Sequence, residues 1–286
     1  MKQDIIIGAA DLYEWSHVKN WVRSIKQSGF EGNTILLCYR VSEDLIHNCS
    51  EEGVTLFHID SDRFNQPIQH GIAGHASDVH QLRFFHFWQA LSTLGLDNYR
   101  YCIATDVRDV IFQTNPSEWL ESNLVNHKYT IPSELIKYED ESWNNNNALT
   151  SLGPIVYTQL FDKPVANVGT IGGDASFLAN LFLTLHTMTI GLSLPSDQSC
   201  FNLLSNGILQ DQGLLVGDKA GWCAQLGVSC DESKQHLQEH LLDLKPVIKE
   251  GLVYNQDGQL YSLVHQYDRI PDLNNIINTR YQCLTL

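Results

Sequence analysis

The N-terminal third of the sequence alternates apolar segments with amphipathic ones, and this order strongly limits the possible folds. Residues 5–10, 34–39 and 54–59 contain no acidic residue, lysine or arginine and are typical of buried strands. Residues 15–28 place apolar side chains at helical spacing, and residues 43–49 fit a short helix. Strand, helix, strand, helix, strand is the order of a wound parallel sheet. We therefore expect an α/β protein, a wound mixed sheet flanked by helices, with a Rossmann-like N-terminal half.

The composition fits such a fold and excludes several classes of partner. The chain has 286 residues, of which 43% are apolar and 18% charged, enough for a sizeable core. Its net charge of −15 argues against nucleic acid or an anionic membrane as principal partner. No segment approaches the roughly 20 apolar residues of a transmembrane helix. Seven cysteines without CxxC spacing indicate free thiols, and no signal-peptide pattern is present, so we expect a cytoplasmic protein.

Two carboxylates follow the end of a segment that we expect to be a buried strand. The β-prone residues 101–104 are followed by Asp106 and Asp109, and a second apolar segment begins directly after them. Because residues three apart face opposite sides of an extended chain, both acids can serve one ligand only if the chain bends near residues 107–108. The carboxyl edge of an α/β sheet is a common ligand site, and a divalent cation carrying a diphosphate fits a carboxylate pair. Alternatively, both acids cap a turn and pair with Arg108.

Residues 106–116 resemble the DxD region of glycosyltransferases with the GT-A fold, with one residue inserted between the two acids. The resemblance implies a nucleotide diphosphate sugar and a bound Mn²⁺ or Mg²⁺. In family 8-like members an arginine on the preceding helix contacts the nucleotide sugar, and Arg83 matches it within the helix expected at 77–94. The alternative for Arg83 is a surface position or a salt bridge within the fold. Ala9 and Ala10, at the end of the first expected strand, suit close approach of a flat ligand, but no GxGxxG fingerprint is present.

Two further motifs resemble retaining GT-A enzymes. Asn167-x-Gly169 matches their Asn-x-Gly strand, and Asp197-Gln198 matches the Asp-Gln pair that begins a helix. The resemblance implies that Asn167 and Gly169 line the sugar site, that Asp197 binds sugar hydroxyls, and that Gln198 lies near the reacting anomeric carbon. Helix capping alone would also explain Asp197. A second Asp-Gln pair at residues 211–212 is a rival copy.

His265 ends an apolar run near the C-terminus. Such a histidine is often a core residue, but many metal-dependent GT-A enzymes take their third protein ligand from a C-terminal histidine, and His265 stands in that place. Two aspartates and one imidazole suit Mn²⁺. The resemblance therefore implies a metal site of Asp106, Asp109 and His265.

The remaining expectations concern elements that connect these motifs. We expect helices at 117–125 and 175–189, a strand at 164–173, and a charged helical stretch up to residue 244. Residues 62–75 and the asparagine-rich residues 139–154 lack periodicity and favour loops. Asp257-Gly258 predicts a hairpin within residues 252–261.

The predicted function is transfer of a sugar from a nucleotide diphosphate sugar to a glycan or other hydroxyl acceptor, with retention of configuration if the resemblance to family 8 holds. It implies a single GT-A-like domain over 1–286, with the nucleotide bound by 1–116 and the sugar and acceptor by 117–286. Three alternatives stay open: a non-catalytic scaffold that binds glycans or a protein, a sugar-1-phosphate nucleotidyltransferase, and a metal-dependent phosphohydrolase. The second lacks its glycine-rich first loop after Ile7, and the third lacks a second acidic or histidine cluster.

Overall fold

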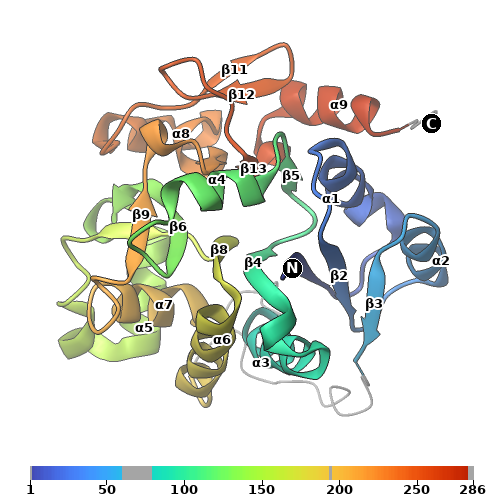
Figure 1. The fold of residues 1–286 in the computed structure, drawn as a ribbon. Coiled ribbons are helices and arrows are strands. Elements are labelled where there is room, and N and C mark those ends of the chain that lie inside the picture. The colour runs from blue at the N-terminus through green and yellow to red at the C-terminus, as the bar shows by residue number, and fades with distance from the viewer. Residues whose placement is uncertain (1, 60–78, 193–194, 283–286) are drawn as a thin grey trace.

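A mixed sheet with helices on both faces forms the centre of the molecule (Figure 1). The structure, a computed structural model, describes residues 2–59, 79–192 and 195–282. The loop expected at 62–75 and the first two residues of the helix expected at 77–94 lie outside these ranges. No helix within them is long and apolar enough to cross a membrane.

The elements follow one another in the expected alternating order. The first part of the chain forms β1 (Gln3–Ala10), α1 (Trp15–Gln27), β2 (Asn33–Cys38), α2 (Glu43–Glu51), β3 (Thr55–His58), α3 (Val79–Leu94), β4 (Tyr99–Thr105), β5 (Val110–Phe112) and α4 (Pro116–Asn123). The rest forms β6 (Tyr129–Lys137), α5 (Ser142–Tyr157), β7 (Pro164–Ala166), β8 (Thr170–Asp174), α6 (Ala175–Thr189), α7 (Asp197–Ser205), β9 (Gly213–Val216), β10 (Cys223–Gln225), α8 (Leu226–Ser229), β11 (Val247–Lys249), β12 (Leu252–Tyr254), β13 (Leu263–His265) and α9 (Pro271–Arg280).

The main sheet has the strand order β3-β2-β1-β4-β8-β6-β7, and β9 pairs with β6. The first four strands in this order are parallel, which confirms the expected winding, whereas β8 runs antiparallel to both β4 and β6. Gly8 pairs with Thr105, and Thr105 pairs with Thr170. The ends of β1 and β4 and the start of β8 therefore meet at one edge, which brings Asp106 and Gly169 together.

Two apolar cores cover the two faces of this sheet. Along β1, Ile5 and Ile7 pack with α3, α6 and α7 on one face, while Ile6 and Ala10 pack with α1, α2 and α4 on the other. All four side chains are fully buried. Each isoleucine contributes about 1.5–3 kcal/mol of burial free energy, so the alternation along one strand fixes both layers.

A second, three-stranded sheet of order β10-β13-β5 meets the main sheet where the chain bends between β4 and β5. In this sheet His265 lies opposite Val110 on one side and Gln225 on the other. A separate core that includes Ile111 and Val264 packs under α9 and holds the small sheet in place. This pairing brings the C-terminal histidine beside the bend.

The largest departure from expectation is α5. Residues 139–154 were expected to form a loop, because asparagine has a low helix propensity and no apolar stripe is present. Instead, Glu141 caps a helix by accepting a hydrogen bond from the Asn144 backbone N–H at 2.8 Å, and the helix kinks at Gly153, where φ is 76°. Its buried side has helical spacing but includes the polar residues Asn144 and Ser151. A hydrophobic pattern does not detect a buried polar stripe.

Three smaller expectations also need correction. The strand expected at 164–173 is divided into β7 and β8 by residues 167–169. The charged stretch before residue 244 forms a 3-10 helix, Glu232–His240, with non-helical backbone at Lys234. The Asp257-Gly258 turn closes only a single bridge between Tyr254 and Leu260, because β12 pairs with β11 instead.

Candidate active site

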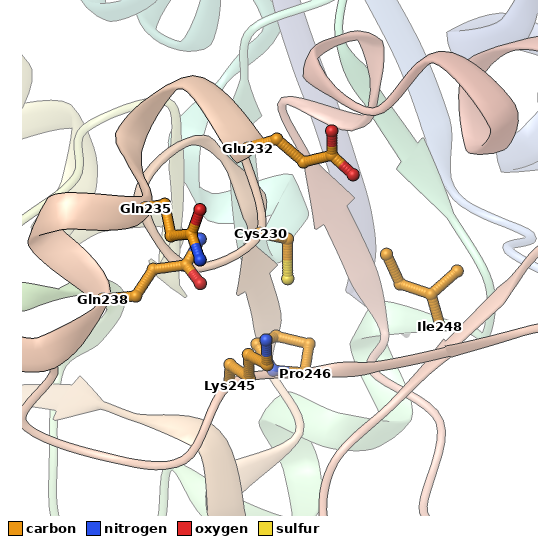
Figure 2. Close-up of a pocket in the computed structure, with 7 residues that line it drawn as sticks. All are labelled: Cys230, Glu232, Gln235, Gln238, Lys245, Pro246 and Ile248. Atoms are coloured by element: carbon orange, nitrogen blue, oxygen red, sulfur yellow. The ribbon is translucent and has the colours of Figure 1, made fainter.

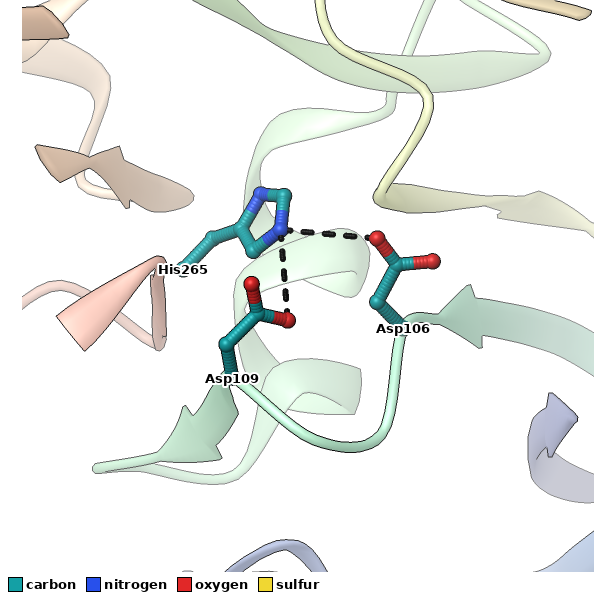
Figure 3. A group of neighbouring side chains, drawn as sticks. All are labelled: Asp106, Asp109 and His265. Carbon is teal, nitrogen blue, oxygen red and sulfur yellow. Dashed lines mark ion pairs between the residues drawn. The ribbon is translucent and has the colours of Figure 1, made fainter. Parts of the chain in front are cut away.

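Asp106, Asp109 and His265 converge on one point at the bend (Figure 3). The chain leaves β4 at Asp106, bends over residues 107–109, and enters β5 after Asp109, as predicted. His265 Nε2 lies 3.5 Å from Asp106 Oδ2 and 3.6 Å from Asp109 Oδ1. One ligand atom of each residue lies within 4.8 Å of the others. The residue inserted between the two acids therefore does not separate them.

The other ring nitrogen of His265 is held by Gln225. His265 Nδ1 donates to Gln225 Oε1 at 2.9 Å, and both side chains are buried. Since a carbonyl oxygen only accepts, this contact keeps a proton on Nδ1. In the neutral imidazole, the lone pair of Nε2 then faces the two carboxylates.

The charges of the three groups depend strongly on one another. Burial alone would lower the pKa of His265, but the carboxylates of Asp109 and Asp106 raise it above its ordinary value. Burial also raises the pKa of Asp109. For Asp106, burial is outweighed by Arg83 and His265, which hold its pKa far below the usual range. The cluster thus calls for a positive charge between the acids, either a proton on His265 or a cation.

The donor set fits a divalent cation. The two Nε2–oxygen contacts, at 3.5 and 3.6 Å, are ion pairs longer than the usual hydrogen bond of about 2.7–3.2 Å, and one ligand atom of each residue faces the same point. Two carboxylates and one imidazole are ligands that Mn²⁺ accepts. Among the described residues Arg108 forms its ion pair with Asp268, at 3.6 Å, and with neither acid, although, against the effect of burial, the charges of Asp109 and Asp106 help to raise its pKa.

Arg83, on α3, connects the acids of two elements. It is 9% exposed, pairs with Asp106, and donates to Asp197 Oδ2 at 3.2 Å. Arg83 is therefore not a surface residue but the centre of a buried ion pair within the fold. Its Nε has no hydrogen-bond partner among the described residues, although the atom is buried. An additional acceptor would satisfy that group.

Asp197 belongs to this ion pair and does not cap its helix. Ser196 is the N-cap residue of α7, and neither its own side chain nor that of Asp197 makes a capping hydrogen bond at this helix start. The rival copy is elsewhere: Asp211 is exposed just before β9. At the end of β1, Ala9 is partly exposed, whereas Ala10 is fully buried against α1.

A cluster of carboxamides lies next to the acids. Asn167 and Gln198 both donate to the carboxylate of Glu134, at 2.8 and 3.0 Å, and so does Asn144, at 2.9 Å. The backbone N–H of Gly169 donates to Asn167 Oδ1 at 2.8 Å. The structure thus brings the two predicted motifs, Asn167-x-Gly169 and Gln198, onto one buried acid.

Glu134 and Asn144 were not predicted as site residues. Glu134 lies on β6, whose sequence contains Pro132, a residue that weakens a strand prediction. Asn144 is one of four consecutive asparagines in the segment that was expected to be a loop. For Asn144, the sequence offered one indication of a buried position, the helical spacing of polar residues along this segment.

A separate pocket of about 550 Å³ shares no residue with this site (Figure 2). It lies between the 3-10 helix Glu232–His240 and the segment that leads into β11, and it is lined by Cys230, Glu232, Gln235, Gln238, Lys245, Pro246 and Ile248, the last of them on β11. No cluster of acids or histidines lines it. The cluster of ionisable side chains lies instead at the edge of the main sheet, around Asp106, Asp109 and His265.

Comparison with solved structures identifies the fold. An active-site mutant of LgtC matches over 98% of this chain and 97% of its own, with a TM-score of 0.57 and 10% sequence identity. The galactosyltransferase LgtC in complex with donor and acceptor sugar analogues matches over 99% of this chain and 96% of its own, with a TM-score of 0.51 and 11% identity. No protein-family model matches the sequence, and no curated protein matches it by sequence. At this identity the likeness concerns the fold: a mixed α/β domain with the GT-A-like architecture of LgtC.

Proposed function

We propose that this protein is a metal-dependent glycosyltransferase that moves a sugar from a nucleotide diphosphate sugar to a glycan or another hydroxyl acceptor, with retention of configuration. The observation that carries the proposal is the meeting of two groups at one sheet edge. Asp106, Asp109 and His265 form a cation-type cluster, and Arg83 links Asp106 to Asp197. The fold is shared with LgtC, which has been solved with donor and acceptor sugar analogues.

On the diphosphate side, Asp106, Asp109 and His265 would hold Mn²⁺ or Mg²⁺. A divalent cation bound there would neutralise the negative charge that develops on the departing diphosphate. Arg83 adds a fixed positive charge beside Asp106, where it would help to neutralise the diphosphate. The small side chain of Ala9 leaves room for the nucleotide at the end of β1, next to Ala10.

On the sugar side, Asp197 and Asn167 would orient hydroxyl groups, with Gly169 allowing close approach of the sugar. Gln198 would lie beneath the anomeric carbon. A carboxamide is not a base at neutral pH and cannot remove the acceptor's proton, which favours retention over inversion at this position. The nearby acids are occupied, Asp197 by Arg83 and Glu134 by three amides.

The first experiment is a thermal-shift screen with UDP, GDP, CDP and ADP, each with and without Mn²⁺. A ligand that binds only the native state stabilises it by about 2.7 kcal/mol at a hundredfold excess over its dissociation constant. We expect one nucleotide to stabilise the protein in a metal-dependent way. Asp109→Asn should abolish that shift, whereas Asp162→Asn, an exposed aspartate paired with Lys163, should preserve it.

The screen and two activity assays together separate the alternatives. Absence of any nucleotide shift would contradict the proposal and favour a non-catalytic scaffold. Release of pyrophosphate from a nucleoside triphosphate and a sugar phosphate would identify a nucleotidyltransferase, and release of phosphate from simple esters would identify a phosphohydrolase. With the donor known, NMR of the product's anomeric proton decides between retention and inversion.

A further inference from the structure

We propose that Glu134 is the positioning residue of the sugar side of this site. Its carboxylate would orient the side chains of Asn144, Asn167 and Gln198, and through Asn167 it would hold the loop between β7 and β8 against Asp106. The proposal rests on the function proposed above and assigns a role to a residue that no motif indicated.

The hydrogen bonds around Glu134 all run in one direction. Oε1 accepts from Asn167 Nδ2 at 2.8 Å and from Gln198 Nε2 at 3.0 Å, while Oε2 accepts from Asn144 Nδ2 at 2.9 Å. Glu134 is only 8% exposed, so few other partners can reach it. An ionised carboxylate accepts hydrogen bonds and donates none, so each of the three carboxamides must turn its NH₂ group toward Glu134.

This orientation decides which end of Gln198 faces the site. Gln198 Nε2 donates to Glu134 and also to Asn144 Oδ1, at 2.7 Å, so both of its N–H groups are used. Within the described part of the chain, Gln198 Oε1 has only a long contact with the Val168 backbone N–H, at 3.4 Å. The carbonyl oxygen is therefore the atom left for the donor sugar. Its partial negative charge suits the positive charge that develops at the anomeric carbon during transfer.

The same carboxylate acts on the backbone beside the metal ligands. With its NH₂ group on Glu134, Asn167 turns Oδ1 toward Gly169, whose N–H donates to it at 2.8 Å. The Gly169 carbonyl in turn accepts from the Asp106 N–H at 2.8 Å. One line of hydrogen bonds thus runs from Glu134 to the first acid of the cation cluster.

The backbone of β6 is distorted where it presents Glu134. The register of β6 against β7 shifts between Ser133 and Lys137, and the next residue, Leu135, is buried with φ of 60°. A left-handed backbone at a residue other than glycine is strained, and strand irregularities commonly redirect a side chain toward a site. The irregular strand is the local reason that Glu134 points at the amides.

Glu134→Gln tests the proposal with little change of shape, because it replaces one acceptor oxygen by an NH₂ group that must face other NH₂ groups. Glu139→Gln is the matched control, since Glu139 lies five residues further on, is exposed, and forms an ion pair with Lys137, at 3.3 Å, away from the carboxamides. Hydrogen exchange is followed at the backbone amides of Val168 and Gly169. We expect faster exchange there in Glu134→Gln and parental exchange in Glu139→Gln.

Kinetics and metal binding give two further readouts. A misplacement of about 1 Å at a reacting group can cost about a hundredfold in rate, so kcat for donor hydrolysis or transfer should fall by that order in Glu134→Gln while the donor KM changes little. Mn²⁺ affinity, measured by electron paramagnetic resonance, should stay near the parental value, because Glu134 reaches Asp106 only through the Gly169 backbone while Arg83 holds the Asp106 carboxylate independently. If Glu134→Gln does not fold, Glu134→Asp, which withdraws the carboxylate by one methylene, is expected to show the same increase in exchange.

Unchanged exchange at Val168 and Gly169 would overturn the positioning role, whatever the activity. Parental kcat in a folded Glu134→Gln protein would overturn the role in orienting Gln198. Failure of the wild-type protein to bind any nucleotide with Mn²⁺ would instead contradict the proposed function, and the exchange measurement would still decide whether Glu134 positions the loop.

Discussion

Gly169→Ala tests whether the space between the sugar side and the metal side is as closely filled as the structure indicates. A Cβ added to Gly169 would lie 2.9 Å from His265 Nδ1 and 2.9 Å from Asn167 Oδ1, and closer still to His265 Cε1. Real Cβ atoms essentially never approach neighbours to under 3.0 Å. Gly169 does not have a positive φ, so alanine is compatible with its backbone and the whole effect comes from crowding.

The magnitude follows from how firmly His265 is held. Its ring is buried, hydrogen-bonded to Gln225, and carried by a strand paired on both sides. The crowding must therefore be relieved by a shift of the ring or of the loop at Gly169, and either shift changes the spacing between His265 and Asp106. Overpacking of this kind costs about 1–3 kcal/mol of folding stability. A ligand displaced by about 1 Å should also lower the transfer rate by about a hundredfold. We expect the affinity for Mn²⁺ to fall together with the rate, although no ligand has been replaced.

The assay is Mn²⁺ titration by electron paramagnetic resonance together with thermal unfolding. Gly53→Ala is the matched control: Gly53 has φ of 79° and open space around its Cβ position, so alanine strains the backbone without crowding any side chain. Left-handed strain costs roughly 1–2 kcal/mol, which reproduces the stability loss without affecting the site. Parental Mn²⁺ affinity in Gly169→Ala would refute the geometry of the cluster.

Three further predictions concern the metal side. His265→Ala should lose most transfer activity and bind Mn²⁺ weakly while keeping a near-parental far-ultraviolet circular dichroism spectrum; equal activity would remove His265 from the site. Gln225→Leu should lower Mn²⁺ affinity by about 10–100-fold, measured by calorimetry, because the imidazole loses the partner that fixes its orientation; parental affinity would show that strand pairing suffices. In the metal-free protein the pKa of His265 is raised by Asp109 and Asp106 against the effect of burial, so its contribution to stability is fully present below the unfolded pKa of about 6.5 and is lost as pH rises through the folded pKa. Mn²⁺ must displace that proton, so its affinity should rise with pH over the same range, with proton release visible as a buffer-dependent binding enthalpy.

The elements predicted from sequence patterns are those that bury apolar side chains. The N-terminal strands and helices, α6, and the bend between Asp106 and Asp109 were all predicted, because alternation of apolar residues and a break in a buried run are visible in one sequence. The residues that were not predicted lie in elements that bury polar side chains. Asn144 occupies the buried side of α5, and Glu134 occupies an irregular strand, so neither carries an apolar pattern. Their positions depend on contacts between distant parts of the chain, which spacing alone does not reveal.

The residue inserted between the two acids has a physical explanation in the main sheet. Val107 is buried, and its side chain occupies the space where a Cβ of Gly8 would lie, at the end of β1. Arg108 instead extends outward to Asp268 and is about half exposed. Of the two residues between the acids, Val107 is thus buried in the core and Arg108 is solvated, so the chain turns from β4 into β5 with both carboxylates on one side. Glycine at position 8 is required by the packing of that bend, and the bend in turn makes DxxD spacing compatible with a single cation site.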